Sequence, residues 1–157
     1  MDYVTPPHRE WGARGCRPAK PHPAYARGMP RARIDETAGR TAVRSATAAL
    51  AVRDVDPSAP PPARDELATA VRYLLQCLSD AAPGKSVEVR VPPLGAVQIV
   101  EGPRHTRGTP PNVVELDAPT FLALATGEVR WGAALAEGRI QASGARSDLS
   151  ALLPVAW

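Results

Sequence analysis

A change of hydrophobic period between residues 65 and 91 sets the fold class of this 157-residue chain. Apolar residues recur every three or four positions from Leu67 to Leu78, which is the spacing of one buried face of an α-helix over 65–80. Residues 86–91, Ser-Val-Glu-Val-Arg-Val, then alternate strictly between polar and apolar, as a strand does when one face is buried. A helix followed directly by such a strand predicts an α+β fold in which helices cover one face of a sheet.

Flanking residues predict the limits of these two segments. Asp65 is a candidate N-cap of the helix, and Pro83-Gly84 is its candidate end, because proline and glycine interrupt helices. The turn-forming run at 92–95, Pro-Pro-Leu-Gly, leads into a second strand over 96–100. We therefore expect an antiparallel hairpin and, with the segments that follow, a mostly antiparallel sheet.

A further helix is predicted upstream, over 35–52, with Asp35 as its N-cap. Its apolar stripe consists mostly of small residues, namely Ile34, Ala38, Ala42, Ala46, Ala49 and Leu50. Because small side chains let two helices approach closely, this helix is expected to pack against a neighbouring helix. The four prolines within Asp56–Ala63 predict a stiff linker to the helix at 65–80.

Start and stop signals divide the C-terminal half into short elements. Asp117 is a candidate N-cap with Pro119 in the first helical turn, and Gly127 and Gly138 are candidate helix ends. Ser147 is a candidate cap for a final helix. The predicted elements are a strand at 112–116, helices at 117–127 and 131–137, a strand at 139–143 and a helix at 147–153.

Charge is divided unevenly along the chain. Of the formal net charge of +3, residues 1–33 carry +5 and residues 34–157 carry −2. Residues 1–32 hold many prolines and few aliphatic side chains, which predicts a disordered leader, with Met29 as a candidate true start of translation. The remainder, 33–154, is expected to form a single, mildly acidic domain, so we expect neither a nucleic-acid partner nor stable membrane insertion.

The chain has few residues of the types that commonly act in catalysis or bind metals. The two cysteines, Cys16 and Cys77, are too few for a disulfide framework or a cysteine-based zinc site, and reduced thiols point to a cytoplasmic location. His105 is the only histidine after residue 34 and lacks a nucleophile or metal partner at a recognisable spacing. No catalytic residue, metal or cofactor is therefore expected, and the chain is interpreted as a protein without enzymatic activity.

A polar loop at 101–111 concentrates basic side chains, and three of its residues, together with the residue that follows it, are candidates for binding the head group of a ligand. They are Arg104, His105, Arg107 and Asn112. Guanidinium groups suit this role because they offer paired donors to a carboxylate or a phosphate. The alternative is a structural loop whose arginines pair with the carboxylates of Glu88, Glu101 or Glu115.

The C-terminal half also follows a recognisable order: an aspartate, a short helix ending in glycine, a second helix ending in glycine and a basic residue, a strand ending in glycine, and a closing helix. The residues in question are Asp117, Phe121, Leu124, Gly127, Trp131, Leu135, Gly138-Arg139-Ile140, Ser143-Gly144, Leu149 and Leu153. This order resembles the C-terminal half of the sterol-carrier-protein domain family. The turn at 91–95 and the loop at 101–112 are similar to those of its bacterial orthologues.

The resemblance implies a sheet of about five strands, with helices that enclose an apolar cavity for a fatty acyl or sterol-like ligand. The side chains expected to line it are Phe121, Leu122, Trp131, Leu135, Ile140, Leu149, Leu152 and Leu153. The alternative is that these residues fill a core without a cavity, because spacing alone does not distinguish the two. The implied function is the non-enzymatic binding or carriage of a hydrophobic ligand.

Two other functions stay open. The apolar faces predicted at 35–52 and 65–80 could dock a protein partner or a second copy of the chain, as an interaction module without a ligand. Sterol-carrier-like folds also occur beside thiol-dependent isomerases, which makes an accessory role there a third hypothesis. Saturable binding of a fatty acyl probe would favour the carrier function, whereas a strict monomer without partners would count against the interaction module.

Overall fold

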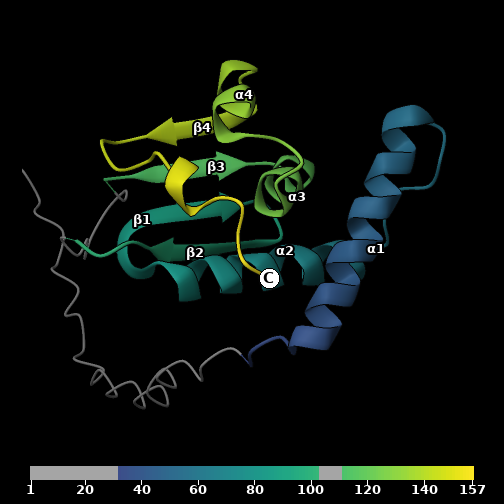
Figure 1. The fold of residues 1–157 in the computed structure, drawn as a ribbon, viewed down its shortest axis with the longest axis horizontal. Coiled ribbons are helices and arrows are strands. Elements are labelled where there is room, and N and C mark those ends of the chain that lie inside the picture. Colours follow the sequence, from purple (N-terminus) through teal and green to yellow (C-terminus); the bar gives the residue numbers. More distant parts are fainter. Residues whose placement is uncertain (1–31, 103–110) are drawn as a thin grey trace, which may run out of the picture. The chain divides into compact units, whose positions relative to one another are not determined.

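The computed structural model describes residues 32–102 and 111–157. Within these ranges, four α-helices, four strands and a final 3₁₀ turn form an α+β fold (Figure 1), which confirms the expected class. The helices are α1 (Glu36–Val55), α2 (Arg64–Ala81), α3 (Ala118–Thr126) and α4 (Trp131–Ala136), and the 3₁₀ turn spans Ser150–Leu152. The strands are β1 (Pro83–Val91), β2 (Gly95–Ile99), β3 (Val113–Leu116) and β4 (Ile140–Ser143).

The strands form one mixed sheet in the order β2-β1-β3-β4. β1 pairs with β2 in the predicted antiparallel hairpin, and β3 pairs antiparallel with β4. The central pair, β1 and β3, is parallel, with Val89 opposite Val114. Two expectations are therefore corrected: the described residues contribute four strands instead of about five, and the sheet is mixed.

The parallel pairing has a topological reason. The hairpin places β2 on one edge of β1, so β3 pairs along the other edge. β2 ends beside the first half of β1, and β3 begins opposite Glu88. β3 then runs opposite to β2 and hence in the same direction as β1. The expected fifth strand rested on the family resemblance and not on a fifth alternating segment, and the residues after β4 form turns.

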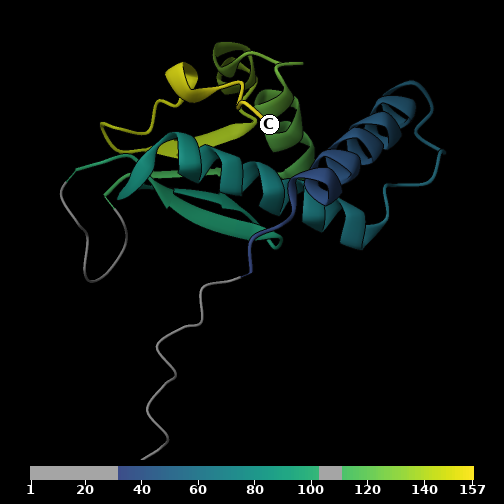
Figure 2. The same cartoon turned by 60° about the horizontal axis from the view of Figure 1, so that its bottom comes forward.

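One face of the sheet is apolar, and the helices cover it (Figure 2). Val87, Val89 and Val91 of β1 are at most 1% exposed, and Val114 of β3 shares their face. α2 packs on β2 and β1, and α3 packs on α2. This agrees with the alternation read from residues 86–91, because every second side chain of a strand points to the same side.

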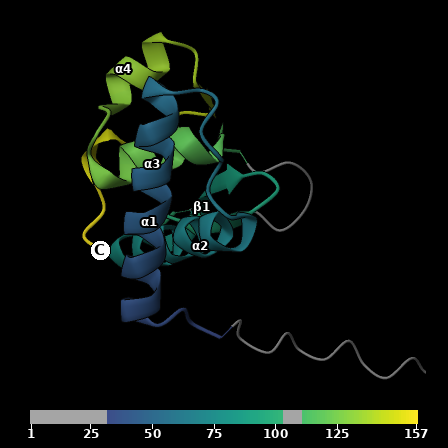
Figure 3. The ribbon, with the colours of Figure 1, turned by 90° about the vertical axis from the view of Figure 1, so that its right-hand side faces the viewer.

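α1 begins at its predicted cap and crosses α2 and α3 (Figure 3). Asp35 Oδ1 accepts hydrogen bonds from the backbone N–H groups of Thr37 and Ala38, at 2.9 and 3.1 Å. The buried face differs from the predicted stripe, since Ala38 is exposed and the buried residues are Gly39, Ala42, Val43 and Ala46. The reason is that the ring of Tyr73 packs on Gly39, a residue that an apolar stripe does not include.

The short helices of the C-terminal half start and end at predicted signals. Asp117 Oδ1 accepts a hydrogen bond from Thr120 N at 2.7 Å, which caps the N-terminus of α3. Gly127 ends α3 with a φ of 86°, a left-handed conformation that glycine adopts without steric penalty. Gly138, two residues after α4, has a φ of 71°. The sequence predicts these helix ends correctly because each signal acts within one turn of the helix that it begins or ends.

Two predicted caps are wrong. α2 begins at Arg64 without a side-chain cap, so Asp65 lies inside the first turn, where a carboxylate still interacts favourably with the helix dipole. Ser147 precedes a 3₁₀ turn instead of an α-helix, and its hydroxyl donates to the Gly144 carbonyl oxygen at 2.7 Å. In both cases a cap-forming residue stands near the element but uses its side chain differently.

Candidate functional site

Seven of the eight residues expected to line a ligand cavity meet in the core. Five are buried, namely Phe121, Leu122, Trp131, Ile140 and Leu149. Leu152 and Leu153 are half-buried and pack against the core. Leu135 is instead 45% exposed, because α4 has only six residues and buries Trp131 and Ala134.

Most of the remaining core residues come from α1, α2 and the sheet, and no sequence pattern indicated which of them would meet α3. The hydrophobic period of each segment shows that one of its faces is apolar, but it does not show which apolar faces pack together. The six side chains that we call the apolar layer are at most 2% exposed. They are Leu74, Leu78, Val89, Val114, Phe121 and Leu122.

Three surface hollows formed by the described residues lie away from the eight expected cavity residues. The first is lined by residues of 83–85 and 101–102, the second by the start of α2 and the turn before β2, and the third by α1 and α2. None of the three includes any of the eight residues expected to line a cavity. A ligand that enters the apolar layer therefore does so by a route other than these three hollows.

Of the four candidate head-group residues, Arg104, His105 and Arg107 lie outside the described residues. Asn112 is buried, with 7% of its surface exposed. Its Nδ2 donates to the Ser86 carbonyl oxygen at 2.7 Å, and its Oδ1 accepts from the backbone N–H of Arg146 at 3.0 Å. Both ends of this side-chain amide therefore join β1 to the segment that follows β4.

Other polar contacts hold the residues at the end of β2. Ser86 Oγ donates to the Val100 carbonyl oxygen at 2.9 Å, and Arg146 Nη1 donates to the Glu101 carbonyl oxygen at 3.0 Å. Val100 has a φ of 63°, a left-handed backbone that is unfavourable for a β-branched residue. Together with Asn112, these contacts fix the chain on either side of residues 103–110.

Arg90 lies between two of the carboxylates considered as partners for the loop arginines. Its Nε donates to Glu88 Oε1 at 2.6 Å, and its Nη1 lies 3.8 Å from Glu115 Oε2. All three side chains lie on the sheet face opposite the valines of β1, as the register of β1 and β3 requires. Both carboxylates therefore have a cationic partner within the sheet itself.

Cys77 lies half-buried on α2. Burial, as the largest effect, raises the pKa of its thiol, so the thiol stays protonated at neutral pH. In residues 32–102 and 111–157, no three side chains of His, Cys, Asp or Glu gather as a metal site. In the same ranges, no helix combines the length and apolar character needed to cross a bilayer.

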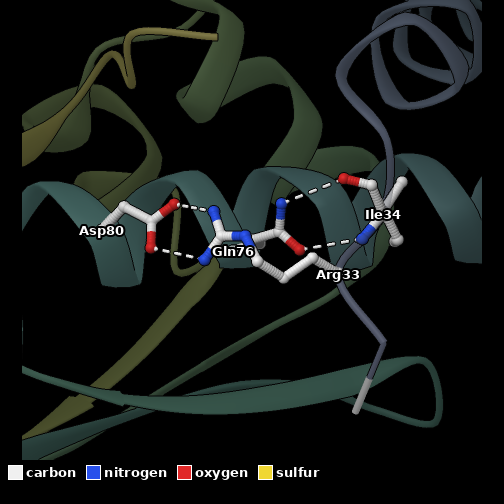
Figure 4. A network of polar contacts seen from close by, with 4 residues as sticks. All are labelled: Arg33, Ile34, Gln76 and Asp80. Atoms are coloured by element: carbon white, nitrogen blue, oxygen red, sulfur yellow. Dashed lines mark hydrogen bonds and ion pairs between the residues drawn. The ribbon is translucent and has the colours of Figure 1, made fainter. Parts of the chain in front are cut away.

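The chain entering α1 is fastened to α2 by four residues that we call the α1 clasp: Arg33, Ile34, Gln76 and Asp80 (Figure 4). The guanidinium of Arg33 makes two contacts with the Asp80 carboxylate, one of them from Nη1 to Oδ1 at 3.1 Å. The side-chain amide of Gln76 accepts from Ile34 N at 3.0 Å and donates to Ile34 O at 3.2 Å. The hydrogen bond from Arg33 holds the pKa of Asp80 below its usual range.

Residues 63–155 match a family model described as a bacterial SCP ortholog, SCP standing for sterol carrier protein. The matched segment runs from the residue before α2 through all four strands to Val155, which packs in the core. α1 precedes the matched segment. No curated protein matches the chain significantly.

Proposed function

The chain belongs to the family of bacterial SCP orthologues, and from this premise we propose that it binds a hydrophobic ligand without catalysing a reaction on it. The ligand class is a fatty acyl chain or a sterol-like lipid. The observation that carries the proposal is the apolar layer, which lies within the family segment and is built of aliphatic and aromatic side chains alone. Such surroundings favour an acyl chain by about 0.8 kcal/mol for each methylene removed from water.

The position of the ligand follows from the side chains of α3. α3 contributes Phe121 and Leu122 to the apolar layer, and the sheet contributes Val89 and Val114. The proposed site is the space between α3, α2 and the sheet, entered when these groups move apart. The head-group role of Arg104, His105 and Arg107 remains a prediction.

A delipidated sample of the full chain, titrated with a fatty acid that carries a fluorescent group, tests this function. We expect saturable binding, and a photoactivatable fatty acid is expected to label peptides of α2 or α3. Absence of saturable binding up to about 0.1 mM, which is weak for such a pocket, would refute the proposal. Labelling confined to the exposed surface around Leu135 would refute the proposed site.

A second candidate function is an interaction module, and the C-terminal end of α1 favours it. Val52 and Val55 are 57% and 89% exposed there, whereas the buried residues of the helix all lie between Gly39 and Ala46. Replacing both with serine would weaken self-association or capture of a protein partner but would leave binding of the fatty acyl probe unchanged. Sedimentation of wild type and variant at several concentrations distinguishes the two functions.

A further inference from the structure

α1 is an addition to the segment that defines the family. The family match begins at Ala63, whereas α1 occupies Glu36–Val55 and is joined to it by the proline-rich linker. α1 packs mainly on α2 and also touches α3 (Figure 3), which are the two helices that cover the apolar layer. The position of α1 therefore bears on access to the proposed ligand site.

The contact that α1 makes is shallow. Its four buried residues are Gly39, Ala42, Val43 and Ala46. None of them is large. At Gly39, the ring of Tyr73 from α2 occupies the space that a side chain on Gly39 would fill. Leu50 of α1 also packs against the core, but it is only half-buried. If α1 moves away, it therefore withdraws small residues and this one half-buried leucine from the core, and it uncovers the Tyr73 ring, which is 4% exposed when α1 is in place.

One side of the seam between α1 and α2 is open. A hollow of about 550 Å³ runs along it, and its lining residues are Asp35, Thr37, Ala38, Thr41, Ala42, Asp65, Glu66 and Thr69. Towards its C-terminus α1 loses contact with the domain, as the exposure of Val52 and Val55 shows. The helix is therefore held along one narrow strip and at its N-terminal entry.

That entry is held by the α1 clasp, whose charged members are solvent-accessible. The side chains of Arg33 and Asp80 are 66% and 51% exposed. Exposed ion pairs contribute little and exchange readily with water, in contrast to the buried contacts of the sheet. The Gln76 amide adds two hydrogen bonds to the backbone of Ile34, whose side chain is half-buried against the core. Opening the clasp therefore breaks these polar contacts and frees Ile34, but it breaks no contact among the six residues of the apolar layer themselves.

We infer that α1 is a lid over the proposed ligand site, with the α1 clasp as its latch. This inference rests on the proposed function. When the clasp opens, α1 moves off α2 and α3, and a fatty acyl chain enters between these two helices. The linker at 56–63 keeps the lid attached, and closure of the clasp afterwards retains the ligand.

Two variants of the full chain loosen the lid by different means. Asp80→Asn breaks the charged contact of the clasp, and Gly39→Ala places a Cβ against the ring of Tyr73. The matched control is Glu137→Gln, which breaks an exposed ion pair with Arg139 after α4. Stopped-flow mixing with the fluorescent fatty acid gives the rate of entry, and amide hydrogen exchange gives the opening of α1.

We expect both lid variants to speed hydrogen exchange in α1. Asp80→Asn should raise the entry rate by about two- to five-fold, the range expected from losing one exposed ion pair. Gly39→Ala should raise the entry rate by about five-fold or more, because overpacking a buried contact costs more than losing an exposed ion pair. Glu137→Gln should leave both rates unchanged. Faster exchange in α1 without faster entry, in a protein that binds the probe, would overturn the lid and leave the proposed function intact. If the wild-type chain does not bind the probe, the proposed function fails first, and the lid fails with it as a route for ligand.

Discussion

The ring of Tyr73 occupies the space in which a side chain on Gly39 would begin. A Cβ on Gly39 would lie 2.7 Å from Cδ1 of Tyr73 and closer still to Cγ and Cδ2, well inside van der Waals contact. Gly39→Ala is therefore expected to lower the free energy of unfolding by about 1–3 kcal/mol, as overpacking of a buried contact does. Urea denaturation followed by circular dichroism measures this loss, and an unchanged midpoint would contradict the contact.

Gly132→Ala in α4 is the matched control for Gly39→Ala, because it makes the same change at a position with free space. A Cβ at Gly132 meets no atom within 4 Å, and the residue lies inside a helix. Alanine favours the helical backbone over glycine, so this variant is expected to gain about 0.5–1 kcal/mol in the free energy of unfolding. The same urea series checks it, and a loss of stability would show that α4 needs the freedom of glycine.

The pH dependence of the α1 clasp follows from Asp80. Its pKa is lower in the folded protein, because Arg33 donates to the ionised form. The stabilisation is therefore complete above the pKa of an unfolded aspartate, about 3.9, and is lost as the pH falls through the lower folded value. Asp80→Asn should be less stable than wild type at pH 7, and the gap between the two should narrow as the pH falls below about 3.9.

The control for this pH series is Asp54→Asn. Asp54 is exposed and forms no ion pair within the described part of the chain. Its replacement should leave the stability difference from wild type close to zero throughout this range of pH. A gap between wild type and Asp80→Asn that persists unchanged at pH 3 would show that the ion pair is not its cause.

Asn112→Ala tests the structural use of a candidate head-group residue. The change leaves the buried Ser86 carbonyl oxygen and the part-buried N–H of Arg146 without their partner. A buried polar group without a partner costs about 1–3 kcal/mol, so the variant should lose at least about 2 kcal/mol of unfolding free energy. Gln141→Ala, at an exposed position of β4, is the control and should change little; equal stability of both variants would contradict the bridge.

Val100 carries backbone strain that Val97 does not. Val100 has a φ of 63°, whereas Val97 lies in the regular part of β2, and both side chains are half-buried. A left-handed backbone costs a non-glycine residue about 1–2 kcal/mol, which glycine at this position recovers. Val100→Gly should therefore be about 1 kcal/mol less destabilising than Val97→Gly in the same urea assay; the reverse order would contradict the strain.

The sequence predicted what depends on neighbours along the chain. The caps at Asp35 and Asp117, the glycine ends and the alternation of β1 all act within a few residues, and the structure confirms them. The parallel pairing of β1 with β3 was missed because it joins segments more than twenty residues apart, and no local pattern specifies the direction of a non-adjacent strand.

In the candidate site, too, local properties were predicted and long-range contacts were not. The eight cavity residues were chosen for apolar character, and seven gather in the core, but Leu135 is exposed because the length of α4 decides which of its sides is buried. The role of Asn112 as a bridge depends on Ser86 and Arg146, which lie 26 and 34 residues away in the sequence. Its residue type alone fitted a ligand contact and a structural contact equally well.

The charged trio on the polar face of the sheet specifies the alignment of the central strands. Arg90 of β1 stands directly opposite Glu115 of β3 in the parallel register, with Glu88 beside it on the same strand. If β3 slipped by one residue, Glu115 would turn towards the apolar layer and Val114 would turn towards water, at the cost of a buried carboxylate without its partner. The opposite charges of Arg90 and Glu115 therefore favour a single register of β1 and β3. A chain with neutral residues at these positions would form misaligned pairings of the two strands more readily while it folds.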